Sequence, residues 1–64
     1  ETGLTEDEYR ILGLLAAGAS NPKIAAELHL SETTVKRKLQ DVFEKLSVTT
    51  RAQAAAEAVR RGLA

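Results

Sequence analysis

Two adjacent helices joined by a tight turn are predicted by residues 20–39, which read SNPKIAAELHLSETTVKRKL. Pro22 fits the first turn of the earlier helix, because a proline there loses no intrahelical hydrogen bond. This helix is expected over residues 22–28. Ser31 has the hydroxyl that a helix start requires, and the second helix is expected over residues 32–46. The pattern is typical of a helix-turn-helix unit.

One further helix is predicted on each side of this unit. Thr5 and Glu8 fit a capping box, which favours a helix over residues 6–17. An alanine-rich segment predicts the last helix over residues 50–61. The predicted fold is all-α, a compact four-helix helix-turn-helix domain that occupies residues 1–64 as a single unit.

Length and composition argue against several other classes of protein. A chain of 64 residues buries only about 60% of the surface that it exposes when unfolded, so a deep catalytic cleft is not expected. With one histidine and no cysteine, neither a metal site nor a cofactor site is predicted. No apolar run approaches the roughly 20 residues that cross a bilayer, so we expect a cytoplasmic protein without membrane contact.

Charge is balanced overall but unevenly distributed. The formal net charge is zero, which alone does not favour nucleic acid. Residues 1–30 hold five acidic and two basic side chains, whereas residues 31–64 hold seven basic and four acidic ones. This asymmetry can orient the domain on a polyanion.

The helix over residues 32–46 is expected to present a polar face opposite its apolar stripe. The predicted inward side chains are Val35, Leu39, Val42, Phe43 and Leu46. Thr33, Arg37, Gln40 and Glu44 project from the other side, with Lys36 on one shoulder and Thr34, Lys38 and Lys45 on the other. Arg and Lys can donate to guanine, Gln can bond adenine, and Thr suits several bases. A DNA-reading face is favoured over a merely solvated charged face.

A phosphate site is predicted where the helix over residues 22–28 begins. Free amides and the positive end of the helix dipole attract anions. Asn21 and Lys23 lie beside them. Ser20 or Asn21 caps this helix, and the alternative is that Asn21 is a cap only.

The last helix carries a strip of small side chains. We expect Ala52, Ala55, Ala56, Val59 and Leu63 to point inward. Ala54, Ala58 and Arg61 then form a neighbouring exposed face, where a second copy can approach closely to give a weak homodimer. The alternative is that these alanines are simply good helix formers on a solvated surface.

Taken together, these residues resemble the LuxR/GerE-type DNA-binding domain of bacterial transcription factors. The similar positions are Leu4, Thr5, Glu8, Leu12, Gly18, Ala19, Ser20, Asn21, Ile24, Ala25, Leu28, Leu30, Ser31, Thr34, Val35, Lys36, Lys45, Leu46, Val48, Arg51, Ala54, Gly62 and Leu63. The resemblance implies a third helix in the major groove of double-stranded DNA and a fourth helix that pairs two domains on an inverted repeat. It also implies an N-terminal receiver or sensor domain, so this chain is expected to be the C-terminal part of a longer regulator in the bacterial nucleoid.

The resemblance also suggests residue roles. By position, Lys36, Arg37 and Gln40 look like base readers, with Thr33 near the same surface. Thr34, Lys38, Lys45 and Arg51 look like contacts to the DNA backbone.

Three residues depart from the family pattern. Asp7 replaces a usual basic residue and removes a possible interhelical ion pair. Pro22 replaces a commoner lysine and with it one phosphate contact. Ser47 stands where glycine often follows the third helix, which predicts a helix end less favourable by up to about 1 kcal/mol.

The main alternative function is a protein-binding helix-turn-helix, such as a sigma-factor-like region that docks RNA polymerase. The balanced net charge favours it slightly. The core of a protein interface, however, is enriched in aromatic residues and Met, and the outward side chains from Thr33 to Gln40 include none. DNA-binding transcription regulation is therefore the favoured function, and an enzyme is not predicted.

Overall fold

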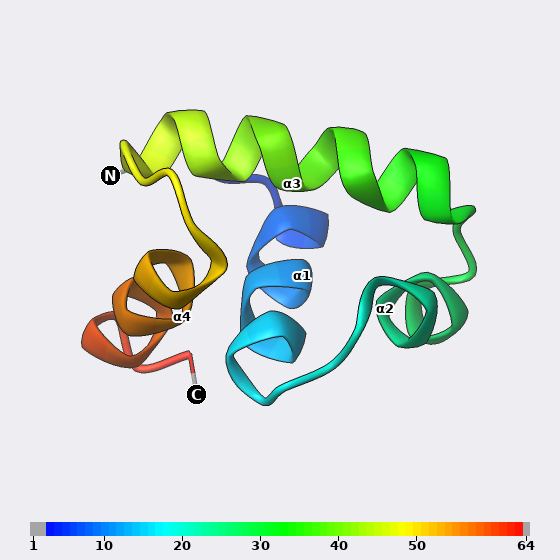
Figure 1. Ribbon diagram of the computed structural model, residues 1–64, viewed down its shortest axis with the longest axis horizontal. Helices are drawn as coiled ribbons and strands as arrows, with labels where there is room; N and C mark the ends of the chain where they lie inside the picture. Colours follow the sequence, from blue (N-terminus) through cyan, green and yellow to red (C-terminus); the bar gives the residue numbers. More distant parts are fainter. Residues whose placement is uncertain (1–2, 64) are drawn as a thin grey trace.

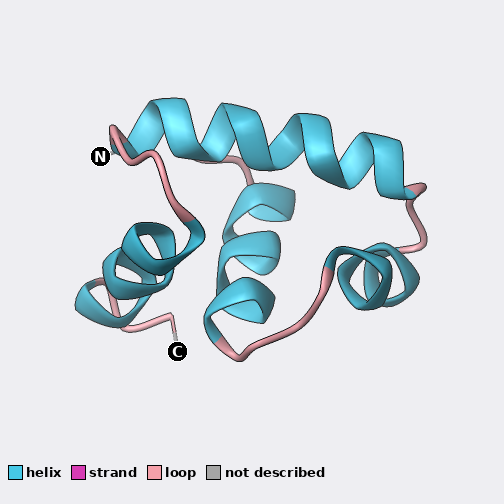
Figure 2. Cartoon of the chain, in the orientation of Figure 1, coloured by secondary structure: helices cyan, strands magenta, loops and turns pink. Residues whose placement is uncertain are grey.

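Each of the four helices begins after a residue whose side-chain hydroxyl caps the helix N-terminus. These residues are Thr5, Ser20, Ser31 and Thr50. The computed structural model describes residues 3–63. Its helices are α1 (Glu6–Ala16), α2 (Asn21–Leu28), α3 (Glu32–Leu46) and α4 (Arg51–Arg60), and Figure 2 shows loops alone between them. Each cap oxygen accepts a hydrogen bond from an amide three residues later. The predicted all-α fold is confirmed, with each helix end within one residue of its expected place.

The central helix is α1, which contacts each of the other three. In Figure 1, α2 and α4 lie on opposite sides of α1, and α3 runs across their ends. Between α2 and α3 the chain turns at His29, whose φ of 58° and ψ of 40° are left-handed. The Leu30 amide then donates to the Ala25 carbonyl over 2.9 Å. This short turn fixes α3 against α2 in the helix-turn-helix arrangement.

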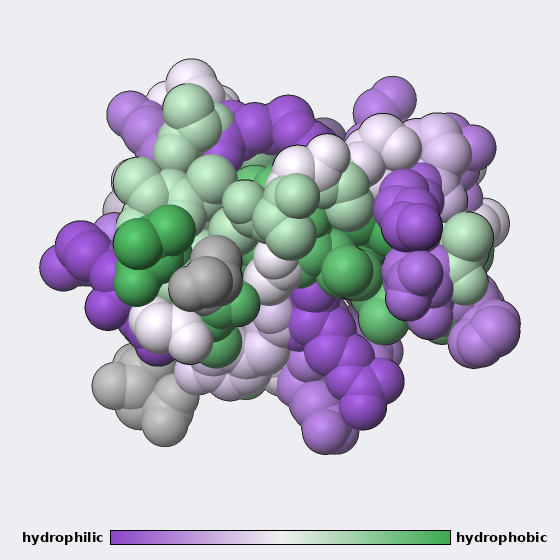
Figure 3. Space-filling view, turned by 90° about the horizontal axis from the view of Figure 1, so that it is seen from below, coloured by the Kyte–Doolittle hydropathy of each residue, from purple (hydrophilic) through white to green (hydrophobic). Residues whose placement is uncertain are grey.

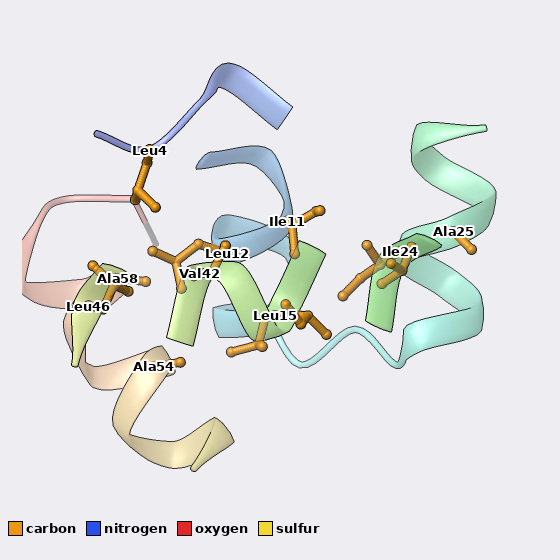
Figure 4. Packing of buried hydrophobic residues seen from close by; sticks show 12 residues of the cluster. Leu4, Ile11, Leu12, Leu15, Ile24, Ala25, Val42, Leu46, Ala54 and Ala58 are labelled. Atoms are coloured by element: carbon orange, nitrogen blue, oxygen red, sulfur yellow. The ribbon is translucent and has the colours of Figure 1, made fainter. Parts of the chain in front are cut away.

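Aliphatic side chains from α1, α2 and α3 form the centre of the core. The largest fully buried ones are Ile11, Leu12, Ile24, Val35 and Val42. Figure 4 shows Leu12 beside Val42, between the alanines of α4 and Ile24 of α2. Burying such a side chain is worth about 1.5–3 kcal/mol, so this packing holds α3 in one rotational setting and directs its polar side outward.

The prediction for the faces of α4 is wrong for Ala52, Ala56 and Val59, which are exposed, whereas Ala55 and Leu63 pack against the core as expected. Ala54 and Ala58 are fully buried, whereas Val59 is 63% exposed. The chain after α4 approaches α1 so closely that a β-carbon added at Gly13 would lie 3.3 Å from the Leu63 carbonyl oxygen. Ala54 and Ala58 therefore belong to the core and cannot form a dimer interface.

At its C-terminus α3 ends on a residue with strained backbone geometry. Ser47 has φ 57° and ψ 41°, the left-handed region in which a β-carbon is unfavourable. Its amide donates to the Glu44 carbonyl over 3.1 Å, and the Val48 amide donates to the Phe43 carbonyl over 3.0 Å. The chain thus adopts the turn that glycine favours without having glycine there.

Candidate nucleic-acid interface

The outer face of α3 brings together the four residues predicted to contact bases. Thr33, Lys36, Arg37 and Gln40 are exposed and line one shallow hollow of about 200 Å³. Within residues 3–63, none of the other three helices covers this side of α3 (Figure 1). Hydroxyl, amide and cationic groups in one place can pair with the donors and acceptors of base edges.

The three residues predicted for the neighbouring shoulder have different surroundings. Thr34 and Lys38 are half-buried on α3. The Ser31 hydroxyl donates to the Thr34 hydroxyl oxygen over 2.9 Å, so Thr34 is part of the helix cap. Lys45 turns toward the start of α1, where its ammonium donates to the Glu8 carboxylate over 2.7 Å and to the Gly3 carbonyl over 3.2 Å. Lys45 is thus exposed but engaged by the start of α1, whereas Lys38 is half-buried and forms no ion pair within residues 3–63.

Glu8 is the buried acid that holds Lys45. Its residue exposure is only 4%, and one carboxylate oxygen also accepts the Thr5 amide over 2.8 Å. Burial raises the pKa of this carboxyl, but the hydrogen bonds from Lys45 and Thr5 outweigh burial and leave the pKa below its ordinary value. An ion pair between α1 and α3 is thus present despite Asp7, through the neighbouring acid.

Two residues predicted to contact phosphate, Asn21 and Arg51, also contact each other. Ser20 caps α2, and Asn21 is its first residue. The Arg51 guanidinium donates to the Asn21 side-chain oxygen and to the Ala19 carbonyl, both over 2.9 Å. The Lys23 ammonium lies 3.8 Å from the Glu27 carboxylate on the exposed surface. No local pattern in the sequence could indicate the Arg51 contacts, because they join segments about 30 residues apart.

Arg61, predicted at the dimer surface, is engaged within its own helix. Its Nε donates to the Glu57 carboxylate over 3.0 Å, and Arg60 donates to the same carboxylate over 2.8 Å. The Arg60 and Arg61 contacts lower the pKa of the Glu57 carboxyl.

Asp41 also lies on the outer face of α3, and the sequence alone assigns it no role. It is exposed and follows Arg37 by one helical turn. That four-residue spacing was the signal that could have identified it.

Sites of other kinds lack the necessary groups. Within residues 3–63, no three His, Cys, Asp or Glu side chains are placed to hold a metal ion. The same part of the chain has no helix with the length and apolar character needed to cross a membrane. A second hollow, of about 520 Å³, lies between α1, α2 and the chain after α4, and Tyr9, Leu14, Leu28 and Leu63 contribute its apolar lining. Figure 3 shows the face opposite α3, with apolar surface at its centre and polar side chains around it.

This geometry defines a helix-turn-helix domain with an uncovered polar recognition helix. Residues 2–58 match the family described as bacterial regulatory proteins, luxR family. The solved structure of the transcription factor GerE has a TM-score of 0.82 and 37% sequence identity, with 94% of this chain and 90% of that chain covered.

Longer proteins contain similar segments. The probable transcriptional regulatory protein NarL of Mycobacterium tuberculosis is 47% identical over 60 residues, which cover 94% of this chain and 28% of that protein. The HTH-type transcriptional regulator MalT of Yersinia enterocolitica is 40% identical over 57 residues, 89% of this chain and 6% of that protein. This chain therefore spans a minor part of the relatives' length.

The chain belongs to the LuxR family of bacterial regulatory proteins, as the family match over residues 2–58 shows. Members of the family are DNA-binding transcription regulators, and the domain is one of these rather than an enzyme.

Proposed function

We propose that this domain binds specific DNA sequences with α3 in the major groove and thereby regulates transcription. The observation that carries the proposal is the gathering of Thr33, Lys36, Arg37 and Gln40 around one hollow on the uncovered side of α3. Lys36 and Arg37 suit the O6 and N7 acceptors of guanine, and Gln40 suits adenine. The polar character of this face favours DNA over a docked protein.

Phosphate contacts are assigned to residues beside this face. Thr34 and Lys38 lie beside the outer face of α3. Asn21 and Lys23 lie in the first turn of α2, where the backbone amides are free to bind an anion. Lys45 has three N–H donors, and its partners Glu8 and Gly3 occupy two of them, so it can reach a phosphate while it holds α1. Arg51 contributes by fixing Asn21.

We further propose that two copies bind an inverted repeat as a weak dimer. The exposed side of α4 supports this, because Ala52, Ala56 and Val59 follow each other at intervals of four and three residues and lie on one face. A contact this small favours association only when DNA aligns the two copies.

In a longer regulator, the domain would act as the DNA-binding output of an N-terminal receiver or sensor domain. The size of the NarL and MalT relatives supports this proposal. We place its action on the nucleoid in the bacterial cytoplasm, with RNA polymerase as a further partner.

The decisive experiment is selection of DNA duplexes from a random pool, followed by titration at two salt concentrations. Arg37→Ala should relax the preference at one base pair by about 1–3 kcal/mol. Lys38→Ala, the matched loss of a cation from the same helix, should weaken binding to all sequences alike and reduce the salt slope by about one. Absence of salt-sensitive binding to any duplex would contradict the proposal.

A further inference from the structure

Asp41 faces the same side as the proposed base readers. At about 100° per residue, it lies about 40° from Arg37 around the helix axis, whereas Gln40 lies about 60° away on the other side. Its side chain is exposed, and it forms no hydrogen bond or ion pair within residues 3–63. A helix that presents Arg37 to DNA therefore presents Asp41 on the flank of Arg37 opposite to Gln40.

A carboxylate has a narrow choice of partners in the major groove, because it only accepts hydrogen bonds. Phosphate oxygens, guanine O6 and N7 and thymine O4 are acceptors, and they repel it. The donors on base edges are the N4 amino group of cytosine and the N6 amino group of adenine. An acidic side chain on this face thus selects between bases, because amino groups attract it and acceptor atoms repel it.

The distance along the helix sets where this partner must lie. Four residues correspond to about 6 Å of helical rise from Arg37. Base pairs are stacked at about 3.4 Å, so 6 Å reaches about two base pairs at most.

We propose that Asp41 is a specificity-determining residue, which requires a cytosine or an adenine on the DNA strand that the carboxylate faces, within about two base pairs of the base that Arg37 contacts. Where that strand carries guanine or thymine instead, the carboxylate loses water and faces an acceptor without compensation. Asp41 therefore lowers the affinity for other sequences more than the affinity for the target. This inference rests on the proposed function.

The test compares wild type, Asp41→Ala and Asp7→Ala. Asp7 is an exposed acid on α1, so its removal changes the net charge equally but outside the outer face of α3. Each protein selects from a random duplex pool and is then titrated with the selected duplex, its single-base-pair variants and a random-sequence duplex.

We expect Asp41→Ala to lose about tenfold discrimination at one base pair. Its affinity for the random-sequence duplex should rise about two- to fivefold, while Asp7→Ala keeps the wild-type preference. Identical preferences in wild type and Asp41→Ala, or an equal rise on selected and random duplexes, would overturn the inference alone. A wild-type domain that selects no sequence would overturn the proposed function as well.

Discussion

At the scale of single residues, Ser47 adopts a backbone conformation that its side chain disfavours. Its left-handed backbone, with φ 57°, carries a steric cost that glycine would avoid. The turn persists because Val48 behind it is half-buried and packs against the core. Tertiary packing therefore determines the backbone at this position against the preference of the residue.

Ser47→Gly should raise the free energy of unfolding by about 0.5–1 kcal/mol, because it removes the β-carbon from a left-handed position. Ser47→Ala is the matched control, since it removes the hydroxyl but keeps the β-carbon. Chemical denaturation monitored by circular dichroism measures both variants. Equal stabilisation by Ala and Gly would show that the hydroxyl, and not the backbone, carries the cost.

At the scale of helices, Glu8 makes contacts both within the first turn of α1 and with the distant helix α3. Its carboxylate completes the capping box of α1 with Thr5 and also binds Lys45 of α3. The start of the central helix is thereby fixed to the last turn of the recognition helix. The ion pair is mostly buried on the Glu8 side, where the side chain is 5% exposed.

This contact predicts acid sensitivity. Because the folded-state pKa of Glu8 is lowered, its stabilisation is complete above the unfolded pKa of about 4.3 and is lost as the pH falls through the folded pKa. Glu8→Gln should cost about 1 kcal/mol at pH 7 and flatten the loss of stability at acid pH. Denaturation curves between neutral and acid pH, with the exposed Glu6→Gln as control, measure this effect. A wild-type slope in Glu8→Gln would contradict the assignment.

The helices also show which parts of the structure could be predicted. Caps and the apolar stripe of α3 are local signals, and they located four helices and the outward residues Thr33 to Gln40. In α4 the helical residues include only one apolar side chain larger than alanine, Val59, so its hydropathy pattern held no information on which alanines face α1. The contacts of Lys45 and Arg51 could not be predicted, because they depend on how distant segments pack.

At the scale of the whole molecule, the placement of charge matters more than its sum. Net charge is zero, yet Lys36, Arg37 and Lys38 follow one another in the sequence of the uncovered helix, with Arg37 on its outer face and a lysine on each shoulder. Weak overall attraction to DNA makes the proposed pairing of two copies more important, because each copy alone has few cations to offer.

Val59→Glu tests that pairing. It should lower the affinity for a duplex with two inverted half-sites about tenfold or more, and leave binding to a single half-site nearly unchanged. Thermal unfolding should change little, because Val59 is 63% exposed. Titration of both duplexes measures the difference, and equal losses on the two would indicate plain charge repulsion instead of a lost contact between copies.

The Arg51 guanidinium acts as a strut between the starts of α4 and α2. Its two hydrogen bonds, to Asn21 and Ala19, bridge helices that flank α1 on opposite sides. Each such bond is worth about 1 kcal/mol, which is enough to favour one orientation of α4 relative to α2 but small enough for the bond to open and re-form. Helix α4, which is proposed to contact a second copy, is therefore linked to the start of α2, which is proposed to contact phosphate. The link is one exposed side chain and does not pass through the hydrophobic core.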